Sequence, residues 1–265
     1  MTIVEFAGII DLMKVHGVID QAIFGPVISR RYGRSLGVNP LPANLKICNF
    51  NCPYCECGWT DVAESRQLDP AQFPTVEGIE AGLRKVLASG VPVDNITVCG
   101  NGEPTLHPEF TKLAKRLVAV RSELAPGAGL VILANSTNLD RPEIIEALAQ
   151  FDEPIMKLDA GTEELFKKIN LPLSPMKIDN ICDVLKRLPN IVIQSMFVQG
   201  RICNTSEEEL APWLQRLGEI KPRLVQVYSL DRVPPDSKLE RVSAEELDAI
   251  AQRIEQLGIP AKVFV

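Results

Sequence analysis

The chain has 265 residues, of which 46% are hydrophobic and 23% are charged, and its formal net charge is −6. This is the composition of a globular protein with enough apolar residues for one core, and it excludes both a disordered chain and a small disulfide-stapled scaffold. The acidic balance argues against non-specific binding to DNA, and no apolar run is long enough to cross a membrane.

Short apolar runs alternate with helical stretches along the chain. The runs are rich in Val, Ile and Leu and do not alternate strictly with polar residues, as expected of parallel strands covered on both faces. The six predicted strands are 45–48, 95–99, 130–134, 154–159, 191–198 and 223–229. Repeated strand–helix units predict an α/β fold with right-handed crossovers, either an open sheet or a barrel. Six units are too few for a complete eightfold barrel.

Three cysteines, Cys48, Cys52 and Cys55, follow one another with the spacing Cys-x3-Cys-x2-Cys. Three thiolates can hold three irons of a cubane [4Fe–4S] cluster and leave the fourth iron with an open coordination position. An open position is typical of catalytic rather than structural metal centres. A zinc site is the alternative, but it needs a second cysteine pair at a workable distance. Cys57 could complete a Cys-x2-Cys-x-Cys pattern, whereas Cys99, Cys182 and Cys203 are scattered with no pairing pattern.

This spacing, with the aromatic Tyr54 just before the last cysteine, resembles the signature of the radical S-adenosylmethionine (SAM) superfamily. The resemblance implies a [4Fe–4S] cluster held by Cys48, Cys52 and Cys55, with SAM bound at the open iron near Tyr54. It also implies reductive cleavage of SAM to a 5′-deoxyadenosyl radical, which abstracts hydrogen from a substrate. An electron donor such as flavodoxin or ferredoxin is then required.

The resemblance also favours a partial, laterally open (β/α)6 barrel over an open sheet, in agreement with the six predicted strands. We expect a single domain over 1–265. Its parts are an N-terminal extension and loop (1–43) that starts with a short helix, a barrel core (44–232), and a closing helix and strand (233–265). A reduced cluster favours the cytoplasm, and the early acidic residues give no sign of a signal peptide.

A glycine-rich segment, Gly-Asn-Gly-Glu-Pro, follows the second predicted strand. Glycines let the backbone approach a ligand closely, and the proline fixes the turn that follows the glutamate. In radical SAM enzymes a similar Gly-Gly-Glu-Pro-like segment receives the ammonium group of SAM. The resemblance therefore implies a group of SAM-binding residues made up of Gly100, Asn101, Gly102, Glu103 and Pro104.

Polar residues stand at the ends of three further predicted strands. Asn135 and Ser136 follow the third strand, Lys157 and Asp159 end the fourth strand on one side, and Gln194 lies in the fifth. Buried polar groups are costly without partners, so a ring of them at one barrel mouth favours a cofactor site. We expect these residues to complete the SAM site. The alternative for each one is a satisfied polar group in the barrel wall.

Three arginines, Arg30, Arg31 and Arg34, lie in a segment ahead of the cysteines. With the motifs above, this segment resembles the radical SAM branch related to wyosine-base-forming tRNA enzymes. Those enzymes carry extra N-terminal cysteines, whereas this chain has none before Cys48, which favours another substrate. Guanidinium groups suit phosphates and carboxylates, so we expect these arginines to bind an anionic substrate. The alternative is that they brace the loop.

The favoured substrate is a nucleobase, a tRNA or a phosphorylated small molecule, and no side chain is assigned a catalytic role. Two other functions remain open. One is an enzyme that activates a glycyl-radical partner or modifies a peptide. The other is a non-catalytic iron–sulfur or zinc module, which would show no spectral response to SAM.

Overall fold

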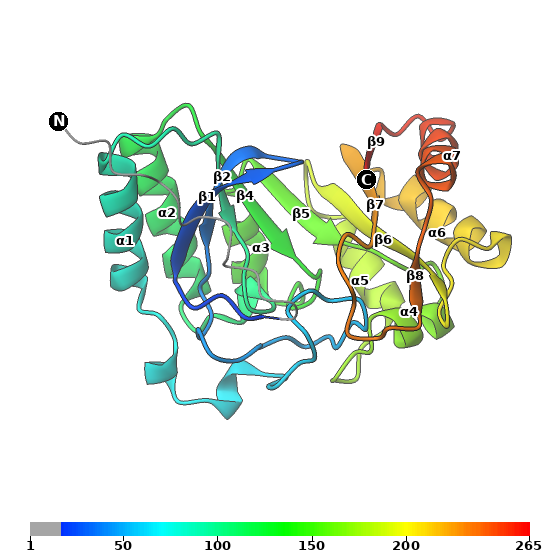
Figure 1. Ribbon diagram of the computed structural model, residues 1–265, viewed down its shortest axis with the longest axis horizontal. Coiled ribbons are helices and arrows are strands. Elements are labelled where there is room, and N and C mark those ends of the chain that lie inside the picture. The colour runs from blue at the N-terminus through cyan, green and yellow to red at the C-terminus, as the bar shows by residue number, and fades with distance from the viewer. Residues whose placement is uncertain (1–16) are drawn as a thin grey trace.

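The computed structural model describes residues 17–265, and its strands form one nine-stranded sheet (Figure 1). The strand order is β1-β2-β3-β4-β5-β6-β7-β9, and β8 pairs with β6. The strands are β1 (Ile23–Ser29), β2 (Gly33–Val38), β3 (Asn95–Val98), β4 (Gly129–Ala134), β5 (Glu153–Lys157), β6 (Val192–Gly200), β7 (Leu224–Ser229), β8 (Leu239–Arg241) and β9 (Ala261–Phe264).

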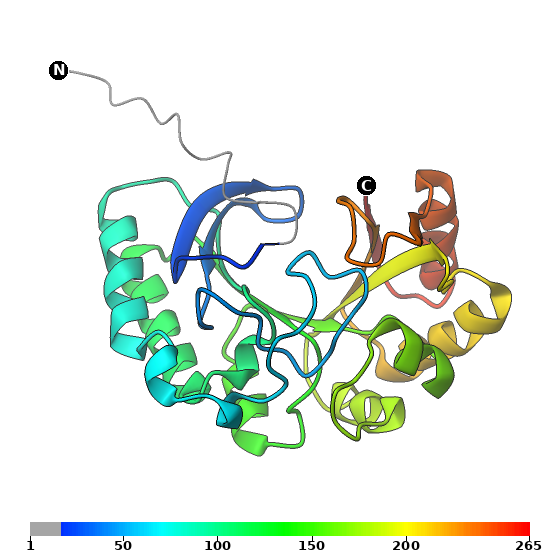
Figure 2. The ribbon, with the colours of Figure 1, turned by 60° about the horizontal axis from the view of Figure 1, so that its bottom comes forward.

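Within residues 17–265, seven α-helices connect these strands. They are α1 (Val76–Ala88), α2 (Phe110–Leu124), α3 (Pro142–Leu148), α4 (Glu163–Ile169), α5 (Ile178–Leu185), α6 (Glu207–Ile220) and α7 (Ala244–Glu255). Apolar residues recur in α1 at helical spacing, from Val76 and Ile79 to Leu83 and Leu87, and all four are buried. The helices lie outside the curved sheet (Figure 2). None of them, within residues 17–265, is both long and apolar enough to span a membrane.

The sheet is an incomplete barrel. β1 and β2 form an antiparallel hairpin, whereas β2 to β7 and then β9 are parallel neighbours. Figure 2 shows the sheet curved, with the loop that carries the three cysteines on its concave side. This arrangement confirms the predicted partial (β/α)6 barrel, with β9 added beside β7.

The predicted first strand was wrong. Residues 45–48 form only isolated bridges, from Ile47 to Val62 and to Gly102, and the first parallel strand is β2. β2 contains two glycines, and for this reason its sequence pattern looks like that of a loop. One of them, Gly37, is required because an added Cβ would lie 2.1 Å from the ring of Phe24.

The predicted N-terminal helix falls mostly on residues 1–16, which lie outside the described part of the chain, and residues 17–22 are not helical. The closing helix and strand predicted near the other end correspond to α7 and β9.

On β5 and β6 the inner face of the barrel changes from apolar to polar along the strand. Tyr32, Val131, Ile155 and Val192 form a small apolar cluster on this face. Two residues further along β4, β5 and β6, on the same side of each strand, come Leu133, Lys157 and Gln194. Together with the cysteine loop, these three residues line one cavity.

Candidate active site

The three motif cysteines line one cavity of about 180 Å³. Cys48 and Cys52 are buried, Cys55 is partly buried, and all three are free thiols. Burial raises the pKa of the Cys48 thiol to about 12, although the nearby Lys46 charge acts against it. No three Cys, His, Asp or Glu side chains within residues 17–265 converge as a single metal ion requires. Three free thiols that line one cavity are suitable ligands for an iron–sulfur cluster.

The glycine-rich segment joins the cysteine loop through its backbone. Ile47 N donates to Asn101 O, and Glu103 N donates to Ile47 O, each at 2.9 Å. Gly102 has a φ of +128°, and a Cβ there would lie 1.7 Å from Ile47 O. Only glycine lets the two segments approach this closely next to Cys48.

Asn101 serves this backbone junction rather than the cavity. Its side chain has no exposure, and its Nδ2 donates to Pro42 O at 2.7 Å and to Ile19 O at 2.8 Å. Gly100 and Gly102 line the cavity, but Asn101 is not among the lining residues. Asn101 stands where the commoner motif has a glycine. Its side chain holds neighbouring segments of the backbone through these hydrogen bonds.

Glu103 is a buried carboxylate that faces the same cavity. Its oxygens accept hydrogen bonds from Asn135 N at 2.6 Å and from Thr105 Oγ1 at 2.6 Å, and burial raises its pKa. Pro104 begins the short turn that follows, and it does not line the cavity. Asn135 links the glutamate to the cysteines, because its Nδ2 lies 3.5 Å from Cys48 Sγ.

A polar network supports the far wall of the cavity. Lys157 Nζ lies 3.0 Å from Tyr54 Oη and 3.4 Å from Asp159 Oδ2, and Tyr54 also bonds to Asp159. Burial lowers the pKa of Lys157, but the charge of Asp159 acts together with the nearby Tyr228 and cysteines to outweigh this effect, so the pKa is raised. Asn170 Nδ2 donates to Asp159 at 2.8 Å and lies 3.6 Å from Cys52 Sγ. Tyr54 and Lys157 line the cavity, whereas Asp159 orients them from behind.

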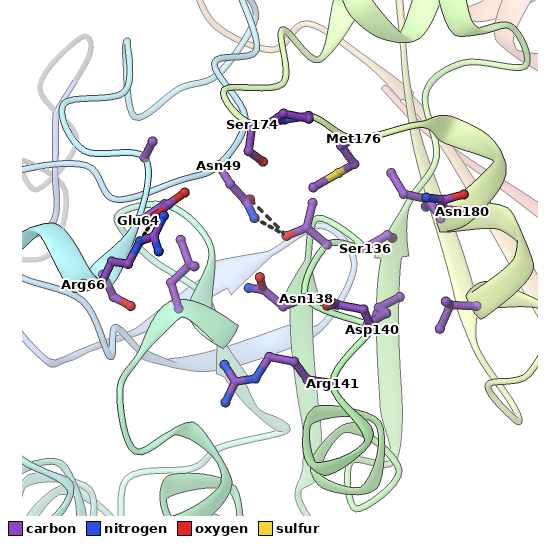
Figure 3. A pocket seen from close by; sticks show the side chains of 18 residues that line it. Asn49, Glu64, Arg66, Ser136, Asn138, Asp140, Arg141, Ser174, Met176 and Asn180 are labelled. Carbon is purple, nitrogen blue, oxygen red and sulfur yellow. Dashed lines mark hydrogen bonds and ion pairs between the residues drawn. The ribbon is translucent and has the colours of Figure 1, made fainter.

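Ser136 and Gln194 lie in different places. Gln194 lines the cavity of the cysteines, and its Nε2 is buried without a partner. Ser136 donates to Lys157 O at 2.8 Å and lines a separate pocket of about 560 Å³. Figure 3 shows this second pocket, with Ser136, Asn138 and Arg141 on one side and Arg66 on the other. Ser136 therefore supports the strand end from outside the cavity.

Several cavity residues had not been predicted from the sequence. Lys46 is buried beside the three cysteines, and Cys57 and Cys99 line the cavity with them. The thiol of Cys57 donates to Gly100 O at 3.4 Å. Lys46 lies only two positions before Cys48, and this nearness was the one local signal that could have identified it. Cys99 directly precedes Gly100, and this position beside the glycine-rich segment was its local signal.

The three arginines do not form one cluster. Arg30 pairs with Asp231 at 2.9 Å, and Arg34 pairs with Asp94 at 2.5 Å. Arg31 has no ion-pair partner among the described residues, and its guanidinium carbon lies 4.8 Å from the ring centre of Tyr228. The contacts of Arg30 and Arg34 thus fit the bracing alternative, whereas Arg31 packs against aromatic rings.

Comparisons with known proteins agree with this fold. The family model of the radical SAM superfamily matches residues 45–201. A UPF0026 protein of Helicobacter pylori is 31% identical over 234 residues, which cover 85% of this chain and 71% of that protein. A GTPase Obg of Brachyspira hyodysenteriae is 29% identical over 231 residues, 86% of this chain. The chain spans only 32% of the length of that second relative.

Two solved structures share the fold at low sequence identity. A radical SAM methyltransferase from Sphaerobacter thermophilus is 19% identical with a TM-score of 0.62, covering 87% of this chain and 65% of that one. TYW1 with a lysine-pyruvate adduct bound is 16% identical with a TM-score of 0.60, covering 84% of this chain and 73% of that one. With the family match and the cysteine cavity, these findings place the chain in the radical SAM superfamily, whose members use a [4Fe–4S] cluster and SAM.

Proposed function

We propose that Cys48, Cys52 and Cys55 hold the [4Fe–4S] cluster and that the adjoining polar residues hold SAM. The observation that carries the proposal is the single cavity lined by these three cysteines together with Gly102 and Glu103. Segments far apart in the sequence meet there, as a site for a cluster and a second cofactor requires. A structural cysteine site would have no need of the glycine-rich turn.

The charge of the cavity fits an iron–sulfur cluster. Lys46 is 1% exposed, and its Nζ donates to Gly58 O at 2.7 Å. Burial lowers its pKa, but the negative charge of Cys55, Cys48 and Cys52 outweighs this effect and raises it. A buried cation is costly unless a negative charge balances it. Three cluster thiolates supply that charge, whereas three neutral thiols do not.

Residues around the cluster are arranged to bind SAM. Glu103 and the backbone carbonyls near Gly100 and Gly102 are suitable acceptors for an ammonium group, and Asn135 holds Glu103 in place. The unpartnered Nε2 of Gln194 is free to donate to the adenosine part. When bound together, the cluster and SAM supply one-electron cleavage of SAM and a radical that abstracts hydrogen.

The proposal is tested by anaerobic reconstitution, chemical reduction, and measurement of 5′-deoxyadenosine formed from SAM. We expect about four irons per chain, which follows from one [4Fe–4S] cluster, and slow formation of 5′-deoxyadenosine without substrate. A non-catalytic module would bind iron but form no 5′-deoxyadenosine and show no spectral change with SAM. Either result in the parent protein would refute the enzyme proposal.

Glu103→Gln separates SAM binding from cluster binding. The change removes a charge-assisted hydrogen bond, so SAM should bind about 1.5–3 kcal/mol more weakly with iron content unchanged. Glu109→Gln is the matched control, because Glu109 lies nearby but is exposed and pairs with Lys112. Equal SAM affinity in both variants would show that Glu103 only shapes the turn.

The substrate class rests on one arginine, and the electron donor rests on the chemistry of the cofactors. An anionic substrate is supported by Arg31 alone of the three arginines, so a nucleotide-like or phosphorylated compound stays the favoured class. A flavodoxin- or ferredoxin-type donor and a cytoplasmic location remain predictions from the cofactor chemistry.

A further inference from the structure

The tip of the β1–β2 hairpin reaches the opposite edge of the barrel. Gln226 Nε2 on β7 donates to Tyr32 Oη at 2.7 Å. The Arg31 guanidinium carbon lies 4.8 Å from the ring centre of Tyr228 and 5.8 Å from that of Phe264. Figures 1 and 2 both show the hairpin tip facing the β7–β9 edge. Arg31 and Tyr32 therefore lie across the open side of the barrel.

The inner face is continuous from the cysteines to this hairpin tip. Lys157 on β5 is in register with Gln194 on β6, which is in register with Gln226 on β7. Residues in register on parallel strands point to the same face of the sheet. Lys157 and Gln194 line the cysteine cavity, so Gln226 lies on the same face, one strand further away.

Two polar groups on this surface lack partners. Arg31 Nη1 and Gln226 Oε1 are both buried without a hydrogen bond, and the Gln226 side chain is 2% exposed. Tyr32 Oη can either donate or accept, so one polar atom of Gln226 stays unpartnered in either orientation of the amide. Unpaired buried groups of this kind cost stability, which makes them typical of ligand sites. The neighbouring Arg30 and Arg34, by contrast, are both paired.

We propose that Arg31 and Gln226 form a subsite for the anionic group of the substrate at the open side of the barrel. Arg31 binds a carboxylate or a phosphate, and Gln226 bonds to a polar group beside it. The aromatic rings of Tyr228 and Phe264 hold the guanidinium plane in place. This inference rests on the proposed function, since it assigns the substrate end of the same site.

The test is calorimetric titration of the reconstituted full-length protein with two probes, inorganic phosphate and lactate, at constant ionic strength in chloride. The probe that binds identifies a phosphate or a carboxylate as the natural group. Arg31→Met keeps the apolar stem against the rings but removes the charge, so it should weaken binding roughly ten- to a hundredfold. Gln226→Met should weaken binding by a smaller factor.

Matched controls come from the same hairpin. Arg30→Gln and Arg34→Gln each remove one positive charge, yet both arginines are already paired, so the affinity should stay within about twofold of the parent. The subsite is refuted if neither probe binds saturably to the parent, if Arg31→Met binds as tightly as the parent, or if the controls lose as much affinity as Arg31→Met.

If Arg31→Met does not fold, Arg31→Lys replaces it. Lysine keeps the charge but lacks the planar fork, so a severalfold loss is expected, and no loss would refute the subsite.

The two proposals fail separately. Anion binding is measured without reductant or SAM, whereas 5′-deoxyadenosine formation is measured in the parent without any anion. A parent protein that cleaves SAM but binds neither probe refutes only the subsite. A parent that binds a probe but does not cleave SAM refutes the radical chemistry.

Discussion

Replacing Gly102 by alanine should separate the glycine-rich segment from the cysteine loop. The new Cβ would lie 1.7 Å from Ile47 O, whereas ordinary contact begins near 3.4 Å, so the backbones must move apart by about 1.7 Å. That shift breaks the two 2.9 Å hydrogen bonds between Ile47 and its neighbours Asn101 and Glu103. Two lost bonds at about 0.5–1.5 kcal/mol each, with about 1–3 kcal/mol for the strained φ, give a loss of roughly 2–6 kcal/mol.

The loss should be visible in urea denaturation of the apoprotein and in iron content after reconstitution, because Ile47 is bonded to Cys48. Gly127→Ala is the control, since a Cβ there meets no atom within 4 Å and the residue is exposed. That change should alter stability by less than about 1 kcal/mol. If Gly102→Ala matched Gly127→Ala in both measurements, the close approach of the two segments would not matter.

Three further outcomes are expected. Cys55→Ala should lose the cluster whereas Cys57→Ala should keep about full iron content, and loss of iron in Cys57→Ala would contradict the three-ligand assignment. Lys46→Met should make the reduction potential of the cluster more negative, because the positive charge of Lys46 favours the reduced cluster. An unchanged potential in an EPR-monitored titration would contradict this role of Lys46. Burial lowers the pKa of His107, so its contribution to stability is present above the unfolded value near 6.5 and is lost as the pH falls. Between about pH 7 and 5, the His107→Gln variant should therefore lose less stability than the parent protein in urea titrations. A pH profile identical to that of the parent would refute this.

The sequence predicted the two motifs that border the cavity, but it did not predict the residues that distant elements bring to the site. The cysteine spacing and the glycine-rich turn are local patterns, and both border the cavity. Asn170, which contacts Cys52 and Asp159, follows α4 with no local signal and is brought in only by the fold. Likewise, nothing in the spacing of Arg30, Arg31 and Arg34 shows which of them meets an acidic partner. Partners supplied by distant strands decide that question.

The first strand shows the same limit in the backbone. Residues 45–48 have a strand-like apolar pattern, but they form only single bridges, from Ile47 to Val62 and to Gly102. β2 contains glycines that weaken the strand pattern, and one is needed because Phe24 packs against it. Sequence periodicity cannot show such a packing requirement.

The contacts across the open side of the barrel have a consequence for the order of folding. The bond between Gln226 and Tyr32 spans 194 residues of sequence, and the bond from Arg30 to Val265 O spans 235. Contacts this distant form late, because the entropy of closing so long a loop opposes them until the intervening chain is ordered. During synthesis the cysteine loop emerges well before β7 and β9. We therefore expect the cavity of the thiols, which residues 46–194 line, to form first and the open side of the barrel to be bridged only in the last step of folding.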